Sequence, residues 1–143
     1  MAVYVDTSAL AKWYVREPGS DEFEAWVQKA PRPTISSLTL VEMRCLLARR
    51  RRAGSLDEQS ESRAYALFLQ DIDRCHLSVE ALDDGDVRSA VHLMGRVDTQ
   101  PLRALDALHL SICASRRIGK LATADAVMAA AASELGIEVV RFN

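Results

Sequence analysis

Short extended segments alternate with longer helical ones along the whole chain, and no other feature of the sequence restricts the fold as much. Runs rich in β-branched, aromatic or aliphatic residues predict strands at residues 3–5, 34–36, 76–79, 121–123 and 137–142. Helical periodicity and capping signals predict helices over residues 7–15, 20–28, 38–52, 55–74, 83–95, 102–118 and 126–135. This alternation favours an α/β fold in which a parallel sheet is covered by helices on both faces.

The chain has the size of one domain. Its 143 residues contain no internal repeat, low-complexity tract or linker, so residues 1–143 are expected to form a single α/β domain. No apolar run approaches the roughly 18 residues that cross a bilayer. A secretory signal is not expected either, because Asp6 interrupts the apolar start of the chain. We therefore expect a cytoplasmic protein that does not enter a membrane.

The overall charge does not favour a nucleic-acid partner, but the distribution of charge is compatible with one. The chain has 18 basic and 20 acidic residues, and this net charge of -2 argues against binding through overall charge. Residues 44–52, however, hold five arginines and no acid. The last four are Arg49, Arg50, Arg51 and Arg52. They are predicted to end a helix, where they either complement the helix dipole in solvent or contact RNA.

Two acidic residues are expected at the carboxyl ends of strands, which is where open parallel sheets bind their ligands. Asp6 ends the first predicted strand, and Asp125 follows the strand at residues 121–123. Each of them also precedes a predicted helix, so each could simply cap that helix by accepting backbone hydrogen bonds. The position of either acid alone does not separate the two interpretations.

Two further acids lie within apolar helical faces. Glu42 shares its face with Leu38 and Leu46, and Asp106 is flanked in the same way by Leu102 and Leu110. An ionised carboxylate that is buried without a partner costs several kcal/mol or becomes protonated. The ordinary partners would be Arg103 for Asp106 and Arg44 or Arg49 for Glu42. Arg103 is too close to Asp106 in the helical phase and the other arginines lie at a helix surface, so a hydrogen-bond network or a metal ion is the alternative.

Convergence of the four carboxylates would imply a divalent cation. Mutual repulsion would raise their pKa values, and a cation is the simplest way to keep them ionised. Ligation by oxygen alone fits Mg²⁺ or Mn²⁺ rather than zinc. Two such ions about 3.5–4 Å apart can activate a water molecule and stabilise the leaving oxygen in phosphodiester hydrolysis. If the four acids converge, they could therefore support metal-dependent hydrolysis of phosphodiesters.

At this point the sequence resembles a known family. The segments that carry the resemblance are residues 3–12 with Glu17-Pro18-Gly19-Ser20, residues 37–42, residues 103–110 and Thr123-Ala124-Asp125. In this order they resemble the motifs of PIN-domain nucleases, and most closely those of VapC-type toxins from toxin–antitoxin modules. The resemblance implies a parallel five-stranded sheet flanked by helices, Mg²⁺-dependent endoribonuclease activity on RNA, a homodimer, and neutralisation by a small antitoxin protein.

The resemblance also assigns roles to individual residues. Asp6, Glu42, Asp106 and Asp125 correspond to the acidic quartet of the family, which binds metal and is catalytic. Asp6 and Asp106 would be the firmest ligands, whereas Glu42 and Asp125 would act directly or through water. Ser8 and Thr123 correspond to the supporting polar positions.

Two other functions are compatible with an α/β chain of this kind. The first is a catalytically silent PIN fold that binds RNA or a protein partner, and the complete quartet counts against it. The second is a receiver domain or a phosphatase of the haloacid-dehalogenase type. It requires a second acid shortly after the first strand, where this chain has Thr7 and Ser8 instead. The chain also lacks a phosphate-binding GxxxxGK loop.

The cysteines and the histidine near Asp106 are interpreted as core residues. Cys45, Cys75 and Cys113 lie far apart without the spacing of a zinc site, and we expect them to be small buried hydrophobic residues. A ligand face formed by Asp106, His109 and Cys113 is conceivable from the helical spacing. Ordinary core packing explains the same spacing, and a sulfur ligand would be out of place in an oxygen site.

Aromatic residues are concentrated on the first two predicted helices. Four of the eight aromatic residues of the chain lie there, namely Trp13, Tyr14, Phe23 and Trp26. Most should belong to the core, and any that stay exposed would form an apolar groove suited to a partner segment. The family resemblance makes the tail of an antitoxin the expected occupant.

Overall fold

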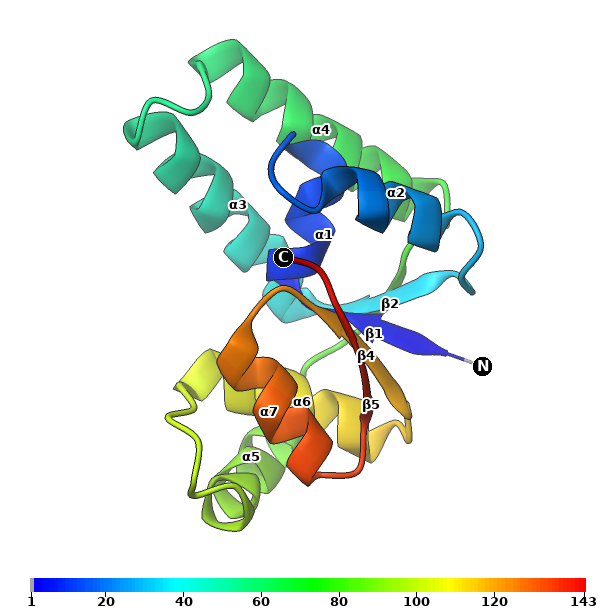
Figure 1. The fold of residues 1–143 in the computed structure, drawn as a ribbon, viewed down its shortest axis with the longest axis vertical. Helices are drawn as coiled ribbons and strands as arrows, with labels where there is room; N and C mark the ends of the chain where they lie inside the picture. The colour runs from blue at the N-terminus through cyan, green and yellow to red at the C-terminus, as the bar shows by residue number, and fades with distance from the viewer. Residues whose placement is uncertain (1) are drawn as a thin grey trace.

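Five parallel strands form the centre of the computed structural model, which describes residues 2–143 (Figure 1). Their bounds are β1 Val3–Val5, β2 Pro33–Ser36, β3 Ser78–Glu80, β4 Lys120–Thr123 and β5 Glu138–Arg141. The strand order in the sheet is β3-β2-β1-β4-β5, and every neighbouring pair is parallel. This confirms the predicted α/β class and the five-stranded sheet. Because β1 is central, its carboxyl end lies between the ends of β2 and β4.

Helices connect successive strands. Their bounds are α1 Thr7–Tyr14, α2 Ser20–Val27, α3 Ser37–Arg52, α4 Glu58–Asp73, α5 Asp84–Arg96, α6 Ala104–Ser115 and α7 Ala126–Glu134. The predicted helices are all present, with shifts of a few residues at their ends. The largest shift is at residues 102–118, where α6 is shorter at both ends. Arg103 has extended backbone as the N-cap, and Arg117 adopts a left-handed φ of 55° that stops the helix.

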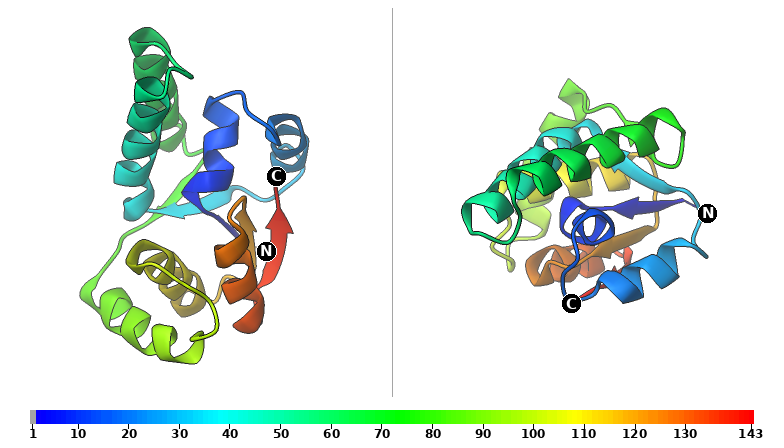
Figure 2. Two further views of the ribbon diagram at one scale, coloured as in Figure 1. Left: turned by 60° about the vertical axis from the view of Figure 1, so that its left-hand side comes forward. Right: turned by 90° about the horizontal axis from the view of Figure 1, so that it is seen from above.

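The helices cover both faces of the sheet. Figure 2 shows α1 to α4 on one side of the strands and α5 to α7 on the other. The alternation of side chains in β1 explains how one strand serves both layers, because Val3 and Val5 belong to the core under the first group while Tyr4 belongs to the core under the second. No helix within residues 2–143 is long and apolar enough to span a membrane.

Two of the three cysteines are exposed, so the expectation that all three are buried is wrong. Cys113 is fully buried in α6 as predicted. Cys45 lies on the side of α3 that faces away from the buried Met43 and Leu47. Cys75 adopts a left-handed φ of 61° in the turn after α4, which is a surface connection.

The aromatic residues of α1 and α2 mostly pack into the core. Phe23 is completely buried, and its ring centroid lies 5.1 Å from that of Phe142 in an edge-to-face contact. Trp13, Tyr14 and Trp26 are partly buried against the same core. Internal packing therefore leaves little of these aromatic side chains exposed to form a groove.

Candidate active site

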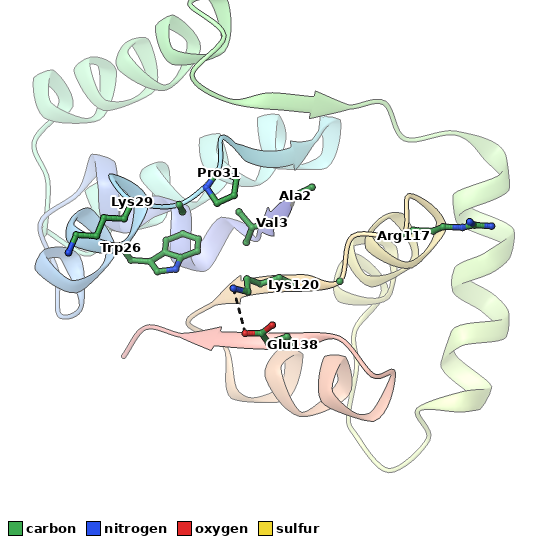
Figure 3. Close-up of a pocket in the computed structure, with 10 residues that line it drawn as sticks. Ala2, Val3, Trp26, Lys29, Pro31, Arg117, Lys120 and Glu138 are labelled. Atoms are coloured by element: carbon green, nitrogen blue, oxygen red, sulfur yellow. Dashed lines mark ion pairs between the residues drawn. The ribbon is translucent and has the colours of Figure 1, made fainter.

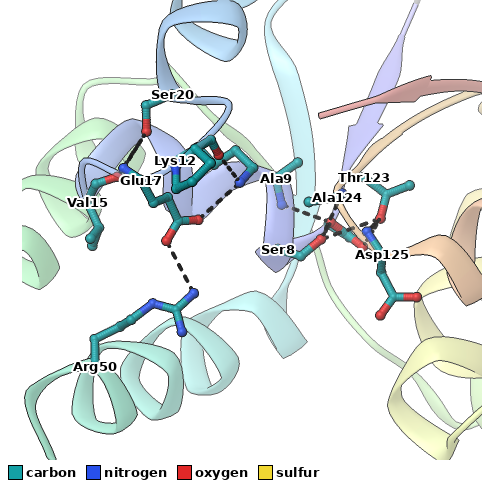
Figure 4. Close-up of polar contacts among 12 residues, drawn as sticks. Ser8, Ala9, Lys12, Val15, Glu17, Ser20, Arg50, Thr123, Ala124 and Asp125 are labelled. Atoms are coloured by element: carbon teal, nitrogen blue, oxygen red, sulfur yellow. Dashed lines mark hydrogen bonds and ion pairs between the residues drawn. The ribbon is translucent and has the colours of Figure 1, made fainter. Parts of the chain in front are cut away.

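Asp6 is fixed at the carboxyl end of the central strand by three hydrogen bonds. Thr123 Oγ1 donates to Oδ2 at 2.6 Å, Ser8 Oγ donates to Oδ1 at 2.7 Å, and the backbone N–H of Ala9 donates to Oδ1 at 3.1 Å. Figure 4 shows Ser8, Ala9 and Thr123 gathered at this point. The last bond also makes Asp6 the N-cap of α1. The two residues predicted as supporting polar positions, Ser8 and Thr123, thus both contact Asp6.

The surroundings of Asp6 disfavour its charge. The carboxyl group is almost fully buried, and burial raises its pKa more than the hydrogen bonds from Thr123 and Ser8 lower it. A nearby cation would favour the ionised form. Asp6 therefore has the electrostatic character of a group that gains from binding a metal ion.

Asp125 is connected to Asp6 through Thr123. The backbone N–H of Asp125 donates to Thr123 Oγ1 at 3.0 Å, and Thr123 in turn donates to Asp6. Asp125 Oδ1 accepts from the backbone N–H of Met128 at 2.8 Å and so caps α7. Both strand-end acids are therefore helix caps, as the first interpretation expects, and both also lie at the ligand-binding edge of the sheet, as the second expects.

Glu42 lies on α3 and points back toward the start of α1. Its Oε1 accepts a hydrogen bond of 2.9 Å from Thr7 Oγ1, and Thr7 directly follows Asp6. His109 Nε2 contacts the same oxygen. Burial raises the pKa of Glu42, but the His109 and Thr7 hydrogen bonds together with the positive charge of Arg49 outweigh it, so the pKa is lowered. The expectation that repulsion raises the pKa of all four acids is therefore wrong for Glu42.

Asp106 lies in the first turn of α6 and is half-buried. Burial raises its pKa first, and the negative charge of Asp125 raises it further. The expected partner, Arg103, meets Asp106 through its backbone N–H, which lies 3.4 Å from Oδ2, instead of through a direct bond from the guanidinium group. Asp106 is thus close enough to Asp125, which follows β4, for the charge of one to act on the other.

The four carboxylates come from one end of the sheet but do not form a closed ligand set. Within residues 2–143, no three His, Cys, Asp or Glu side chains are grouped so that they could hold a metal ion as they stand. Hydroxyl groups hold the acids individually instead: Thr123 bonds the carboxylate of Asp6 and the backbone of Asp125, and Thr7 bonds Glu42. The donor chemistry, carboxylate and hydroxyl oxygen, still fits a hard cation such as Mg²⁺ or Mn²⁺. Binding one would require the side chains to draw together.

The sequence interpretation missed the role of His109. This histidine is 2% exposed, and its two ring nitrogens contact Tyr4 and Glu42. It does not form a ligand face with Cys113, whose Sγ donates to the carbonyl oxygen of Ile118. The available signal was a histidine on the inner, apolar face of the helix that carries Asp106, since a buried imidazole needs polar partners.

The arginine run divides into two pairs. Arg50 donates to Glu17 Oε2 at 3.2 Å, and Arg51 donates to Glu61 Oε1 at 2.9 Å (Figure 4 shows the first pair). Both acids are largely buried, so these two arginines tie the end of α3 to neighbouring segments. Arg49 and Arg52 are exposed, and the charge of Arg49 reaches Glu42. Of the four arginines predicted as possible RNA contacts, Arg49 and Arg52 therefore remain the candidates.

A separate cavity lies at the opposite end of the sheet. It has a volume of about 590 Å³ and is lined by Val3, Trp26, Pro31, Lys120 and Glu138, among others (Figure 3). Val3, Lys120 and Glu138 begin their strands, so the cavity opens at the amino ends. None of the four acids lines it. Substrate chemistry at the carboxylates therefore does not involve this cavity.

Comparison with known proteins gives a consistent picture. The family model described as PIN domain matches residues 3–134. The chain is 32% identical over 142 residues to Ribonuclease VapC46 of Mycobacterium tuberculosis, a match that covers 97% of this chain and 96% of that protein.

Solved structures agree on the fold. The VapC20 toxin of Mycobacterium tuberculosis has a TM-score of 0.71 at 23% identity, with 91% of this chain and 95% of that chain covered. VapBC2 of Rickettsia felis, bound to a promoter DNA fragment, has a TM-score of 0.71 at 13% identity, with both chains covered completely. Together with the family-model match and the sequence identity to VapC46, these similarities show that the chain belongs to the PIN domain family.

Proposed function

We propose that this protein is a metal-dependent endoribonuclease, the toxin of a toxin–antitoxin pair, that hydrolyses RNA phosphodiester bonds. The observation that carries the proposal is the set of four carboxylates at one end of the sheet, in a chain 32% identical to a ribonuclease over nearly its whole length. The structural relative VapC20 is described as a toxin that cleaves the sarcin-ricin loop, which also supports an RNA substrate.

Asp6, Glu42, Asp106 and Asp125 are the residues that would hold Mg²⁺ or Mn²⁺. When bound, the cation would supply the positive charge that activates a water molecule and stabilises the leaving oxygen. Thr123 and Ser8 orient the carboxylate of Asp6 through their hydroxyl hydrogen bonds. Thr7 orients Glu42 in the same way.

An antitoxin is the proposed protein partner. Similar structures include a toxin–antitoxin complex from Klebsiella pneumoniae and DNA-bound VapBC from Salmonella typhimurium. On this chain, a cavity of about 470 Å³ offers apolar walls from Tyr14, Leu56 and Leu67, with Arg16 and Arg63 also lining it. An antitoxin tail with apolar and acidic side chains would match this lining. The cavity includes one of the four aromatic residues expected at a partner groove, Tyr14.

A homodimer is proposed from an exposed apolar stripe on α5. Val87, Val91 and Met94 recur at helical spacing, and Val91 is 70% exposed. A stripe of this kind on a surface helix is typical of a subunit contact. The cytoplasmic location stays a prediction, consistent with RNA as the substrate.

Purified protein incubated with RNA tests the nuclease proposal. Cleavage should stop in chelator and return with Mg²⁺ or Mn²⁺. Asp6→Asn and Asp106→Asn should remain folded, by circular dichroism, and should not cleave. Cleavage in chelator, or full activity of both variants, would refute the metal-dependent mechanism. Tight RNA binding without any cleavage by the wild-type protein would instead identify a catalytically silent binding module.

A further inference from the structure

A buried histidine links the two layers of the core to the candidate site. His109 lies on α6, and its ring packs edge-to-face on Tyr4, with centroids 5.6 Å apart and an interplanar angle of 64°. Tyr4 is completely buried in β1, two residues before Asp6. The Tyr4 hydroxyl lies 2.6 Å from His109 Nδ1, and His109 Nε2 contacts Glu42 Oε1. These contacts form a chain from the central strand to a carboxylate of the site.

The hydrogen-bond chemistry fixes the direction of this chain. Glu42 Oε1 can only accept when the carboxylate is ionised, so His109 Nε2 must carry the proton. In a neutral imidazole Nδ1 is then an acceptor, and the Tyr4 hydroxyl can satisfy it by donating. Tyr4 is suited to this role because its hydroxyl keeps its proton at neutral pH. Glu42 thus fixes the tautomer of His109, and Tyr4 satisfies the other ring nitrogen and holds the imidazole in place.

The two carboxylate oxygens of Glu42 differ in their hydrogen bonding. Oε1 receives donors from both His109 and Thr7. No hydrogen bond or ion pair from residues 2–143 reaches Oε2. We propose that His109 is a positioning residue that fixes Glu42 through Oε1 and leaves Oε2 as the oxygen available to a divalent cation. This inference rests on the proposed function, because it takes Glu42 as part of the metal site.

A purely structural histidine would have different consequences. If His109 only filled the core, its replacement would lower stability without a specific effect on the cation. If it positions Glu42, its replacement should weaken cation binding even where the protein stays folded. Residues that orient metal ligands typically change metal affinity by 10–100-fold when they are removed. The two roles therefore differ in a binding measurement that needs no RNA and no cleavage.

The experiment measures Mn²⁺ dissociation constants by calorimetry on the full chain, together with melting temperatures. His109→Leu should weaken Mn²⁺ binding about 10-fold or more. His109→Gln should restore most of the affinity, because the glutamine amide N–H can take the place of Nε2–H. Cys113→Ala is the matched control, since Cys113 is buried one turn further along α6. It should lower the melting temperature without changing Mn²⁺ affinity.

Glu42→Gln separates failure of this inference from failure of the proposed function. Glu42→Gln should weaken Mn²⁺ binding, and adding His109→Leu to it should weaken binding no further, because His109 acts through Glu42. If Glu42→Gln binds Mn²⁺ like wild type, Glu42 is not a ligand and the proposed site is wrong. If Glu42→Gln is impaired but His109→Leu is not, the site stands and the positioning role is overturned.

Tyr4→Phe keeps the test decisive if His109→Leu does not fold. Loss of the hydroxyl removes one of the two polar contacts that hold the imidazole ring and leaves Nδ1 buried without a donor, so the ring is held less firmly against Glu42 Oε1. Mn²⁺ binding should then weaken several-fold in a folded variant, and the effect should disappear in the Glu42→Gln background. Wild-type Mn²⁺ affinity in Tyr4→Phe would overturn the proposal.

Discussion

The division of the arginine run makes a specific prediction about RNA binding. Arg49 and Arg52 are exposed, whereas Arg50 and Arg51 form ion pairs with Glu17 and Glu61. Each phosphate neutralised on a single strand contributes about 0.7 to the slope of log affinity against log salt. If Arg49 and Arg52 each contact one phosphate, the double variant Arg49→Gln, Arg52→Gln should flatten the slope by about 1.4.

The matched control changes the same number of charges on the same helix. Arg50→Gln with Arg51→Gln should leave the salt slope nearly unchanged, because these guanidinium groups are already engaged within the protein. This control should instead lower the melting temperature modestly, because Glu17 and Glu61 are largely buried and each loses one of two cationic partners, with Lys12 and Arg44 remaining. The two double variants should therefore show opposite patterns in binding and in stability.

The assay is fluorescence anisotropy of a labelled single-stranded RNA, titrated at several salt concentrations in chelator so that no cleavage occurs. Equal flattening by both double variants would show that overall charge, and not the position of the arginines, governs binding. An unchanged slope in both would return the run to the role of a solvated helix end. Either result would refute the division made here between contacting and structural arginines.

Three further outcomes are expected. Burial raises the pKa of Asp6, so the wild-type protein loses stability as pH rises through that pKa. In chelator at neutral pH, Asp6→Asn should therefore melt no lower than wild type. Any higher melting temperature of the variant should disappear below about pH 4, where Asp6 is protonated in both the folded and the unfolded protein. The Arg116 hydrogen bonds hold the pKa of the buried Asp86 at about 2. This stabilisation is present above about pH 4 and is lost as pH falls toward 2. The unfolding free energy of wild type, measured by denaturant titration, should therefore approach that of Asp86→Asn by roughly 2 kcal/mol over this range. Val91→Glu should convert the proposed dimer into a monomer in light scattering, and an unchanged dimer would place the contact elsewhere.

The fold could be predicted from local signals because they agree along the chain. The apolar run of the strand at residues 3–5 and the capping residues of the helices each act within a few positions. The placement of Asp6 and Asp125 followed from the same logic, since they lie one and two residues after β1 and β4, which are neighbouring parallel strands. Local patterns therefore located half of the candidate site.

The rest of the site depends on contacts between distant segments. Tyr4 and His109 are 105 residues apart, and nothing in the local pattern of either indicates the other. Arg50 and Arg51 likewise pair with acids on separate segments, so a run of four like charges concealed two different roles. The exposure of Cys45 depends on which side of α3 meets the core. Such contacts require the assembled fold.

The hydrogen bonds of the acids explain how four carboxylates can share one edge of a sheet without a cation. In Glu42, Asp106 and Asp125, one oxygen of each carboxylate accepts from the protein: Thr7 and His109, the backbone of Arg103, and the backbone of Met128. The three aspartates, Asp6, Asp106 and Asp125, lie at the N-termini of α1, α6 and α7, where the helix dipole favours negative charge. No hydrogen bond from residues 2–143 reaches the second oxygen of Glu42, Asp106 or Asp125, whereas both oxygens of Asp6 accept. Each acid is thus held by the protein itself, so we expect the fold not to depend on the cation. The protein in chelator at neutral pH should consequently keep its helical circular dichroism and its cooperative melting, and loss of either on chelation would show that the cation is part of the fold.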